Sequence, residues 1–87
     1  MTAEERLLEA GWEGITILKD YDYDSALIGV THDGRAVYDF DKMVEWIAET
    51  EGCSYEDAME WVDYNTIRAL GYFGSDSPIV MYRLEEA

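Results

Sequence analysis

The chain has 87 residues, and 20 Asp and Glu residues against six Lys and Arg residues give it a formal net charge of −14. A small soluble domain usually carries a net charge of about 2–8 in magnitude, and an excess of this size repels nucleic acids and phosphate ligands. Hydrophobic residues make up 48% of the chain, which excludes a disordered acidic tail. We therefore expect a single folded domain over residues 1–87, whose charge is either solvated or directed at a basic partner.

The sequence also bears on where the protein works. The segment 1–6 has neither the basic region nor the apolar core of a signal peptide, and no run approaches the roughly 20 apolar residues of a membrane span. The single cysteine, Cys53, cannot form an internal disulfide, which fits a reducing compartment. We expect a cytoplasmic protein that does not bind membranes.

The N-terminal segment predicts a short helix followed by a strand. Thr2 and Glu5 match a capping box, so a helix should begin there and end near Gly11. The β-branched residues within 14–18 then predict a short strand.

A β-hairpin is predicted over residues 26–39. The dipeptide Asp33-Gly34 lies between two apolar runs and is the strongest hairpin signal in the chain. With a two-residue turn, Val30 would lie opposite Val37.

Two helices and a last strand complete the chain. Asp39 or Asp41 can cap a helix over 41–51, and a second capping pattern starts a helix over 54–65. Residues 78–84 read as the last strand. The sequence therefore predicts an α+β fold. Its small antiparallel sheet is formed by the hairpin 26–39 and the strands 14–18 and 78–84, and it packs against the helical hairpin 41–51 and 54–65 and the short N-terminal helix.

Residues suited to catalysis are scarce. His32, the only histidine, precedes the hairpin turn, where an exposed structural residue is usual. Cys53 lies between two predicted helices, and no base adjacent in sequence activates it. Twenty acids guarantee close carboxylate pairs by chance, so such pairs carry no signal for acid–base catalysis. We therefore expect that the protein is not an enzyme. A hydrolase or metal-dependent enzyme would need a clustered carboxylate site with a bound cation.

The segment around Asp20, Asp22 and Asp24 has carboxylates where an EF-hand loop has its first three ligands. However, Ser25 replaces the glycine required at position six, and Thr31 replaces the glutamate required at position twelve. We expect a solvated acidic connector here, with a weak cation site of another kind as the alternative. The sequence predicts no metal and no cofactor.

The acids concentrate in the two central helices. Residues 39–63 hold nine acids and Lys42 alone as a cation, a net charge of −8. Two like-charged pairs, Glu45/Glu49 and Glu56/Glu60, stand at i, i+4 spacing, which brings their Cβ atoms to roughly 5–6 Å and is mildly destabilising. A rigid helix can thus present a row of negative charge, as a nucleic-acid strand presents its phosphates.

Aromatic residues border the same stretch. Trp46 and Trp61 lie at the flanks of their apolar stripes, where they either border the core or anchor an interface. The acidic segment near the N-terminus is a second candidate patch. The candidate partner-binding residues are Glu45, Glu49, Glu56, Glu60, Asp63, Trp46, Trp61, Asp20, Asp22 and Asp24.

Four stretches resemble a group of small acidic proteins common in bacteriophage and prophage genomes. They are Tyr23-Asp-Ser-Ala-Leu-Ile-Gly-Val30, Val37-Tyr-Asp-Phe-Asp-Lys-Met43, Ser54-Tyr-Glu-Asp-Ala-Met-Glu-Trp-Val-Asp-Tyr-Asn65 and Pro78-Ile-Val80. The resemblance spans about residues 20–82. After Asn65 similar proteins read Gly-Ala-Trp-x-Gly, whereas this chain has Arg68-Ala-Leu-Gly-Tyr-Phe-Gly74. The group offers no catalytic residues, but its phage context implies a protein that binds and blocks host machinery, as anti-CRISPR and other anti-defence inhibitors do.

The leading hypothesis is a non-enzymatic, phage-type inhibitor acting in the cytoplasm of the host cell. Its acidic face would occupy the nucleic-acid-binding groove of a basic host defence protein, such as a CRISPR effector nuclease, without itself binding nucleic acid. The alternative is a phage structural or interaction module that binds a partner, or a second copy as a homodimer, through a sheet edge and aromatic surface. Evenly solvated acids remain the simplest explanation of the charge.

Overall fold

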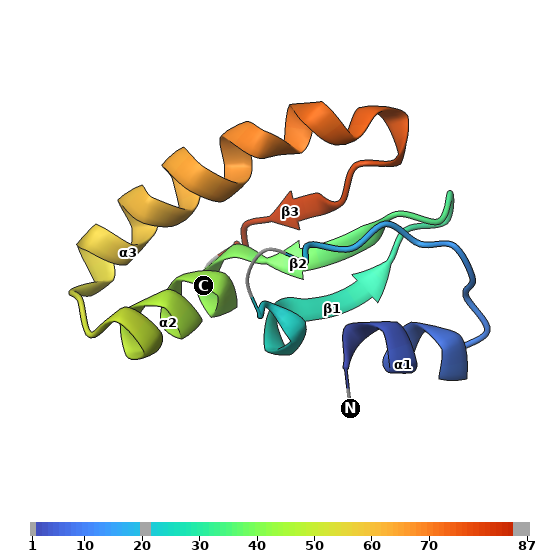
Figure 1. Cartoon of the computed structure of the whole chain (residues 1–87), viewed down its shortest axis with the longest axis horizontal. Helices are drawn as coiled ribbons and strands as arrows, with labels where there is room; N and C mark the ends of the chain where they lie inside the picture. Colours follow the sequence, from blue (N-terminus) through green and yellow to red (C-terminus); the bar gives the residue numbers. More distant parts are fainter. Residues whose placement is uncertain (1, 20–21, 85–87) are drawn as a thin grey trace.

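The protein has an α+β fold, as expected, with a small mixed sheet and helices packed around it (Figure 1). The computed structural model describes residues 2–19 and 22–84. In chain order the elements are the helix α1 (Ala3–Glu9), the 3-10 turn η1 (Asp24–Ala26), the strands β1 (Leu27–Val30) and β2 (Ala36–Asp39), the helices α2 (Phe40–Glu51) and α3 (Tyr55–Val62), the π-helical turn η2 (Asp63–Ile67), the 3-10 segment η3 (Arg68–Asp76) and the strand β3 (Ile79–Met81).

The sheet has the order β1-β2-β3, and the expectation of an all-antiparallel sheet is wrong. β1 and β2 form the antiparallel hairpin, whereas β3 runs parallel to β2, with Val37 opposite Ile79. The parallel direction of β3 depends on the long helical connection between β2 and β3. This connection returns the chain to the end of the sheet where β2 begins, so both strands run the same way. Only residues 79–81 of the predicted last strand, 78–84, pair in this way.

The hairpin turn is one residue longer than predicted, which changes the register. The Gly34 N–H donates to the Thr31 carbonyl (3.0 Å), and the Thr31 N–H donates to the Arg35 carbonyl (2.8 Å), so the loop has three residues. Gly34 has φ +84°, the left-handed conformation that such a loop needs. Val30 therefore lies opposite Ala36 instead of Val37.

Residues 14–18 do not form the predicted strand. The stretch is irregular, and its side chains Ile15, Ile17 and Leu18 pack half-buried against the core. The Leu18 N–H donates to the hydroxyl of Tyr38 (3.1 Å). The carbonyl of Leu27 in β1 accepts from the Arg6 guanidinium (2.9 Å). This carbonyl is therefore already bonded and is not left for a further strand at the edge of β1.

The helix starts predicted from the sequence are confirmed. Thr2 and Glu5 form a complete capping box on α1. Asp39 caps α2 by accepting from the Asp41 N–H (2.9 Å), and this helix ends at Gly52 with φ +66°. The third helix begins as expected, with Ser54 accepting from the Asp57 N–H (3.1 Å).

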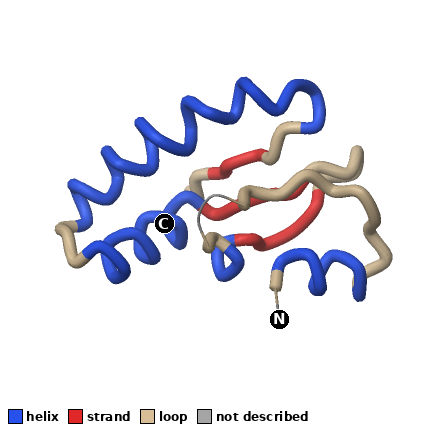
Figure 2. The backbone as a smooth tube through the Cα atoms, viewed as in Figure 1, coloured by secondary structure: helices blue, strands red, loops and turns tan. Residues whose placement is uncertain are grey.

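The third helix runs further than the predicted range 54–65. After α3 the chain stays helical through η2 and η3, a long rod that ends near Gly74 (Figure 2). Gly71 is accommodated inside the rod, whereas Gly74 has φ +74° and breaks it. The candidate functional residues of the rod lie in its first part, within the predicted helix 54–65.

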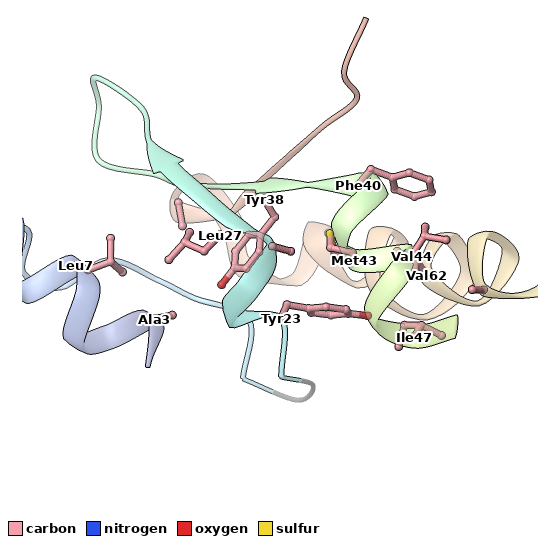
Figure 3. Packing of buried hydrophobic residues seen from close by; sticks show 13 residues of the cluster. Ala3, Leu7, Tyr23, Leu27, Tyr38, Phe40, Met43, Val44, Ile47 and Val62 are labelled. Carbon is pink, nitrogen blue, oxygen red and sulfur yellow. The ribbon is translucent and has the colours of Figure 1, made fainter. Parts of the chain in front are cut away.

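The core lies between the sheet, the helical hairpin and α1 (Figure 3). Tyr23 and Tyr38 are its largest fully buried side chains. The rings of Trp46 and Tyr23 pack edge to face, with their centroids 5.6 Å apart. The buried members are Ala3, Leu7, Tyr23, Ala26, Leu27, Ala36, Tyr38, Phe40, Met43, Val44, Ile47, Ala58 and Val62.

Candidate functional site: the acidic face of the helical hairpin

Three of the four arginines bind elements of the fold to one another. Arg6 donates to the carbonyls of Asp24 (2.8 Å) and Leu27, which fastens α1 to η1 and β1. The Arg35 Nε donates to the Ser77 carbonyl (2.8 Å), which joins β2 to the segment before β3. The guanidinium of Arg83, which follows β3, lies beside the carboxylates of Asp39 and Asp41 at the start of α2. Arg6 and Arg35 therefore bind backbone carbonyls, and Arg83 binds Asp39 and Asp41. Among the residues that the structure describes, none of the three arginines forms an ion pair with the exposed acids further along the helices.

Two of the nine acids in residues 39–63 do not belong to an exposed face. Asp39 is 2% exposed, and its carboxylate lies 2.9 Å from Arg83 Nε. Asp41 is half-buried, lies 3.6 Å from the same guanidinium and accepts from the Tyr55 hydroxyl (3.2 Å). Partial burial, and next the negative charge of Asp41, raise the pKa of Tyr55. These two acids hold the helical hairpin in place.

The other seven acids of this stretch are exposed. Within residues 2–19 and 22–84, the ion pairs are Lys19–Glu4 and the two pairs of Arg83, so none of the seven is paired with a described cation. They are Glu45, Glu49, Glu51, Glu56, Asp57, Glu60 and Asp63. Uncompensated carboxylates on rigid helices produce a strong local negative potential.

The rod formed by α3 and η2 aligns three of these acids. Ala58, Val62 and Thr66 are buried, so the face that contains them packs inward. Glu56, Glu60 and Asp63 follow one another at i, i+4 and i+7, which places them in a row on the opposite face. We call these three residues the acidic row. All three are candidate residues predicted from the sequence, and the helical turn η2 continues the helix from Asp63.

The helix α2 contributes a second, weaker group. Glu45 and Glu49 are exposed at i, i+4, while Met43, Val44 and Ile47 are buried on the other side. Lys42 is also exposed, three residues before Glu45, so it offsets part of the charge on this helix. The acidic row on the rod has no lysine at such spacing.

The two candidate tryptophans have different surroundings. Trp46 is half-buried against Tyr23 and borders the core. Trp61 is also half-buried, and it lines a shallow hollow of about 500 Å³ on the flank of the rod, together with acids. Tyr64, 64% exposed, lines the same hollow. It is one of the aromatic residues of the acidic stretch that the sequence offers as possible interface anchors, although it is not among the ten candidate partner-binding residues.

The N-terminal acidic patch stands apart from the acidic row. Asp20 lies outside the described residues. Asp22 is exposed, Asp24 is half-buried, and both line a hollow of about 410 Å³ with Arg6 and Trp46. No residue of the rod lines this hollow, so the structure does not join Asp22 and Asp24 to the acidic row there.

His32 and Cys53 lie apart from one another on the elements predicted for them. His32 is exposed at the hairpin tip, where Thr31 and Asp33 bond to one another through their side chains. Cys53 is half-buried between α2 and α3. In the described part of the chain, no group of three or more His, Cys, Asp and Glu residues is arranged to hold a metal ion. Nor is any described helix both long enough and apolar enough to cross a membrane.

Comparison with protein-family models, with curated proteins and with solved structures finds no match to this chain.

Proposed function

We propose that this protein is an inhibitor that binds the basic, nucleic-acid-binding groove of a host protein through the acidic row. The observation that carries the proposal is the alignment of Glu56, Glu60 and Asp63 along an exposed helical face, where none of the three forms an ion pair with a described cation. The exposed acids Glu45 and Glu49 of the neighbouring helix extend the negative surface. Because the protein would act by occupying a groove, it needs no catalytic residues.

The physical basis is preorganisation. The acids stand on a packed helical rod, so their charges are already in place before the partner arrives, and little side-chain order must be gained beyond the carboxylates themselves. A row of like charges that repel one another in the free protein gains most when a basic groove neutralises it. Association should therefore be fast and should weaken steeply as salt is added.

The class of partner comes from the resemblance to small acidic phage proteins. Proteins of that context commonly block host defence machinery, and a groove that binds DNA or RNA is the basic surface that defence nucleases have in common. We propose a CRISPR effector nuclease as the target class, bound in the cytoplasm of the host cell.

The proposal is tested by reversing charge at the acidic row. The triple variant Glu56→Lys, Glu60→Lys and Asp63→Lys should lose at least about 100-fold in affinity for the target nuclease, since like charges facing each other cost several kcal/mol. A matched control, Glu9→Lys, Glu13→Lys and Asp76→Lys, makes the same change in net charge at exposed positions away from the row.

Binding to a panel of purified CRISPR effector complexes, and release of their DNA, would be measured across a range of salt concentrations. Wild type should bind in competition with DNA, and the control should stay within a few-fold of it. Equal losses in both triple variants would show that only net charge matters, and unchanged affinity in the acidic-row variant would refute the proposal.

An apolar interface is favoured by a different observation. Val37, Ile79 and Met81 share the sheet face opposite to the buried Ala36 and Tyr38, and all three are only half-buried. We propose, as the alternative function, that this face and the β3 edge bind a partner or a second copy of the chain. Such an interface would resist salt, so sedimentation of the protein alone at low and high salt separates it from groove binding.

A further inference from the structure

A hollow on the rod is lined by both aromatic and acidic side chains. Asp57, Glu60, Trp61 and Tyr64 follow at i, i+3, i+4 and i+7, so they share one flank of the helix, and Asp63 and Asn65 complete the lining. The hollow is shallow and encloses about 500 Å³. Two of the lining residues, Trp61 and Tyr64, are aromatic, and three, Asp57, Glu60 and Asp63, are acids.

The position of Asn65 is set by the π-helical turn. Its side-chain amide donates to the Trp61 carbonyl (3.0 Å), four residues earlier. This bond holds the amide against the helix backbone. The lining is thus built on a packed helical segment, and the hollow does not depend on a loop.

The aromatic and acidic residues that line the hollow favour a particular kind of cation. A divalent metal ion needs several oxygen ligands close together, and the carboxylates here are not clustered in that way. A planar, delocalised and weakly hydrated cation suits the site better, because it can lie on an aromatic ring and donate to carboxylates at its edge. The arginine guanidinium has these properties, whereas the lysine ammonium is a compact and strongly hydrated charge.

The chain itself contains one such contact. The guanidinium carbon of Arg68 lies 4.6 Å from the centre of the Tyr64 ring. Arg68 does not line the hollow, so this contact leaves the hollow accessible. Tyr64 therefore already binds a guanidinium on the rod, and it also lines the hollow.

We propose that this hollow binds an arginine side chain of the basic partner, with the guanidinium against Trp61 and Tyr64 and its N–H groups donating to Asp57 and Glu60. The inference rests on the proposed function, which supplies a basic protein as partner. It goes further by separating two tasks: the acidic row attracts any basic surface, and the hollow selects arginine.

The test uses three short peptides with blocked ends, in which glycines flank a central arginine, lysine or citrulline. Citrulline has the shape of arginine without its charge. In an NMR titration of the ¹⁵N-labelled protein, the arginine peptide should bind about two- to fivefold more tightly than the lysine peptide, the range of an exposed cation–π contact. The citrulline peptide should bind most weakly. The amide signals that shift should be those of residues 57–65.

Two variants locate the binding. Glu60→Gln should weaken the arginine peptide by about threefold or more, whereas the control Glu9→Gln, another exposed helical glutamate, should leave it unchanged. Tyr64→Leu keeps an apolar side chain but removes one of the two rings, so it should reduce the preference for arginine over lysine.

Equal affinities for arginine and lysine, or equal losses in the two glutamine variants, would overturn the inference. These results can be told apart from failure of the proposed function. If the acidic-row variant loses the nuclease while arginine shows no preference, only the hollow is refuted. If arginine binds in the hollow while that variant still binds the nuclease, the groove proposal fails and the arginine site stands.

Discussion

Arg83 lies beside Asp39 with Nε 2.9 Å from Oδ2, and the two side chains differ sharply in exposure, 53% for the arginine and 3% for the aspartate. The same carboxylate accepts from the Asp41 N–H at the start of α2 (2.9 Å). One buried acid thus joins the end of β2, the first turn of α2 and the segment that follows β3. This contact orients the helical hairpin, and with it the acidic row, on the sheet.

Replacing Arg83 should destabilise the protein. Arg83→Ala leaves the Asp39 carboxylate buried with one partner fewer, and we expect the free energy of unfolding to fall by about 1–3 kcal/mol in urea titrations. Asp39→Asn should recover part of this loss in the Arg83→Ala background, because it removes the buried charge. Arg68→Ala removes only the exposed cation–π contact with Tyr64 and should cost about 0.5–1 kcal/mol. A loss of similar size in both arginine variants would show that the Asp39 contact is unimportant.

Local signals in the sequence predicted most of the helical part of the fold. Thr2, Asp39 and Ser54 cap the helices as expected, since a capping side chain bonds to backbone only two or three residues away. The direction of β3 could not be predicted in this way, because it depends on the long connection through α2, α3 and the rod. The stretch 14–18 has strand-like residues, but the structure uses them to pack on the core.

The candidate site was predicted in part for the same reason. Exposed acids at i, i+4, such as Glu56 and Glu60, can be read from helical spacing alone. That Asp39 is buried beside Arg83 could not be read, because the two residues are 44 positions apart in the sequence. The residues that line the hollow at Trp61 and Tyr64 all lie within the predicted helix 54–65, but helical spacing does not show that their side chains border a hollow.

A buried hydrogen bond fastens the π-helical turn to the rest of the molecule. The hydroxyls of Tyr23 and Thr66 lie 2.9 Å apart, and both side chains are buried. Thr66→Val keeps the shape of the side chain but removes this bond, so the free energy of unfolding should fall by about 1 kcal/mol.

A double-mutant cycle with Tyr23→Phe should show a coupling of about 0.5 kcal/mol or more between the two positions. Strictly additive losses would mean that the two hydroxyls do not stabilise one another.

The buried Tyr38 should make stability fall at high pH. Burial raises the pKa of its hydroxyl, an effect that outweighs the opposing hydrogen bond from the Leu18 N–H. The folded state therefore keeps the phenol proton at pH values where the unfolded chain, with a tyrosine pKa of about 10, loses it. Its contribution to stability is fully present below about pH 10 and is lost as pH rises further, through the raised pKa.

Tyr38→Phe should remove this part of the pH dependence. Urea titrations between pH 8 and about 11 should give a shallower decline of stability for the variant than for wild type, even if the variant is less stable at neutral pH. The other tyrosines titrate in both proteins and cancel in the comparison of slopes. Parallel declines would show that Tyr38 has an ordinary pKa in the folded state.

The acidic row should itself reduce the stability of the free protein. Glu60→Lys removes the repulsion from Glu56 and places a lysine four residues after a glutamate, the favourable order on a helix, so each change should contribute about 0.2–0.5 kcal/mol. We expect the variant to be more stable than wild type in dilute buffer by the sum of the two. Glu60→Gln should show only the first gain. In 1 M salt, where charges are screened within about 3 Å, both gains should vanish.

The same substitution is predicted to weaken binding to a basic groove, so stability and binding should change in opposite directions at one residue. A gain in stability together with a loss of binding distinguishes an acid that binds a partner from one that is only solvated. If Glu60→Lys lowers stability in dilute buffer, or if its gain persists in 1 M salt, the carboxylate of Glu60 has a structural role, and the acidic row cannot be treated as an uncompensated surface.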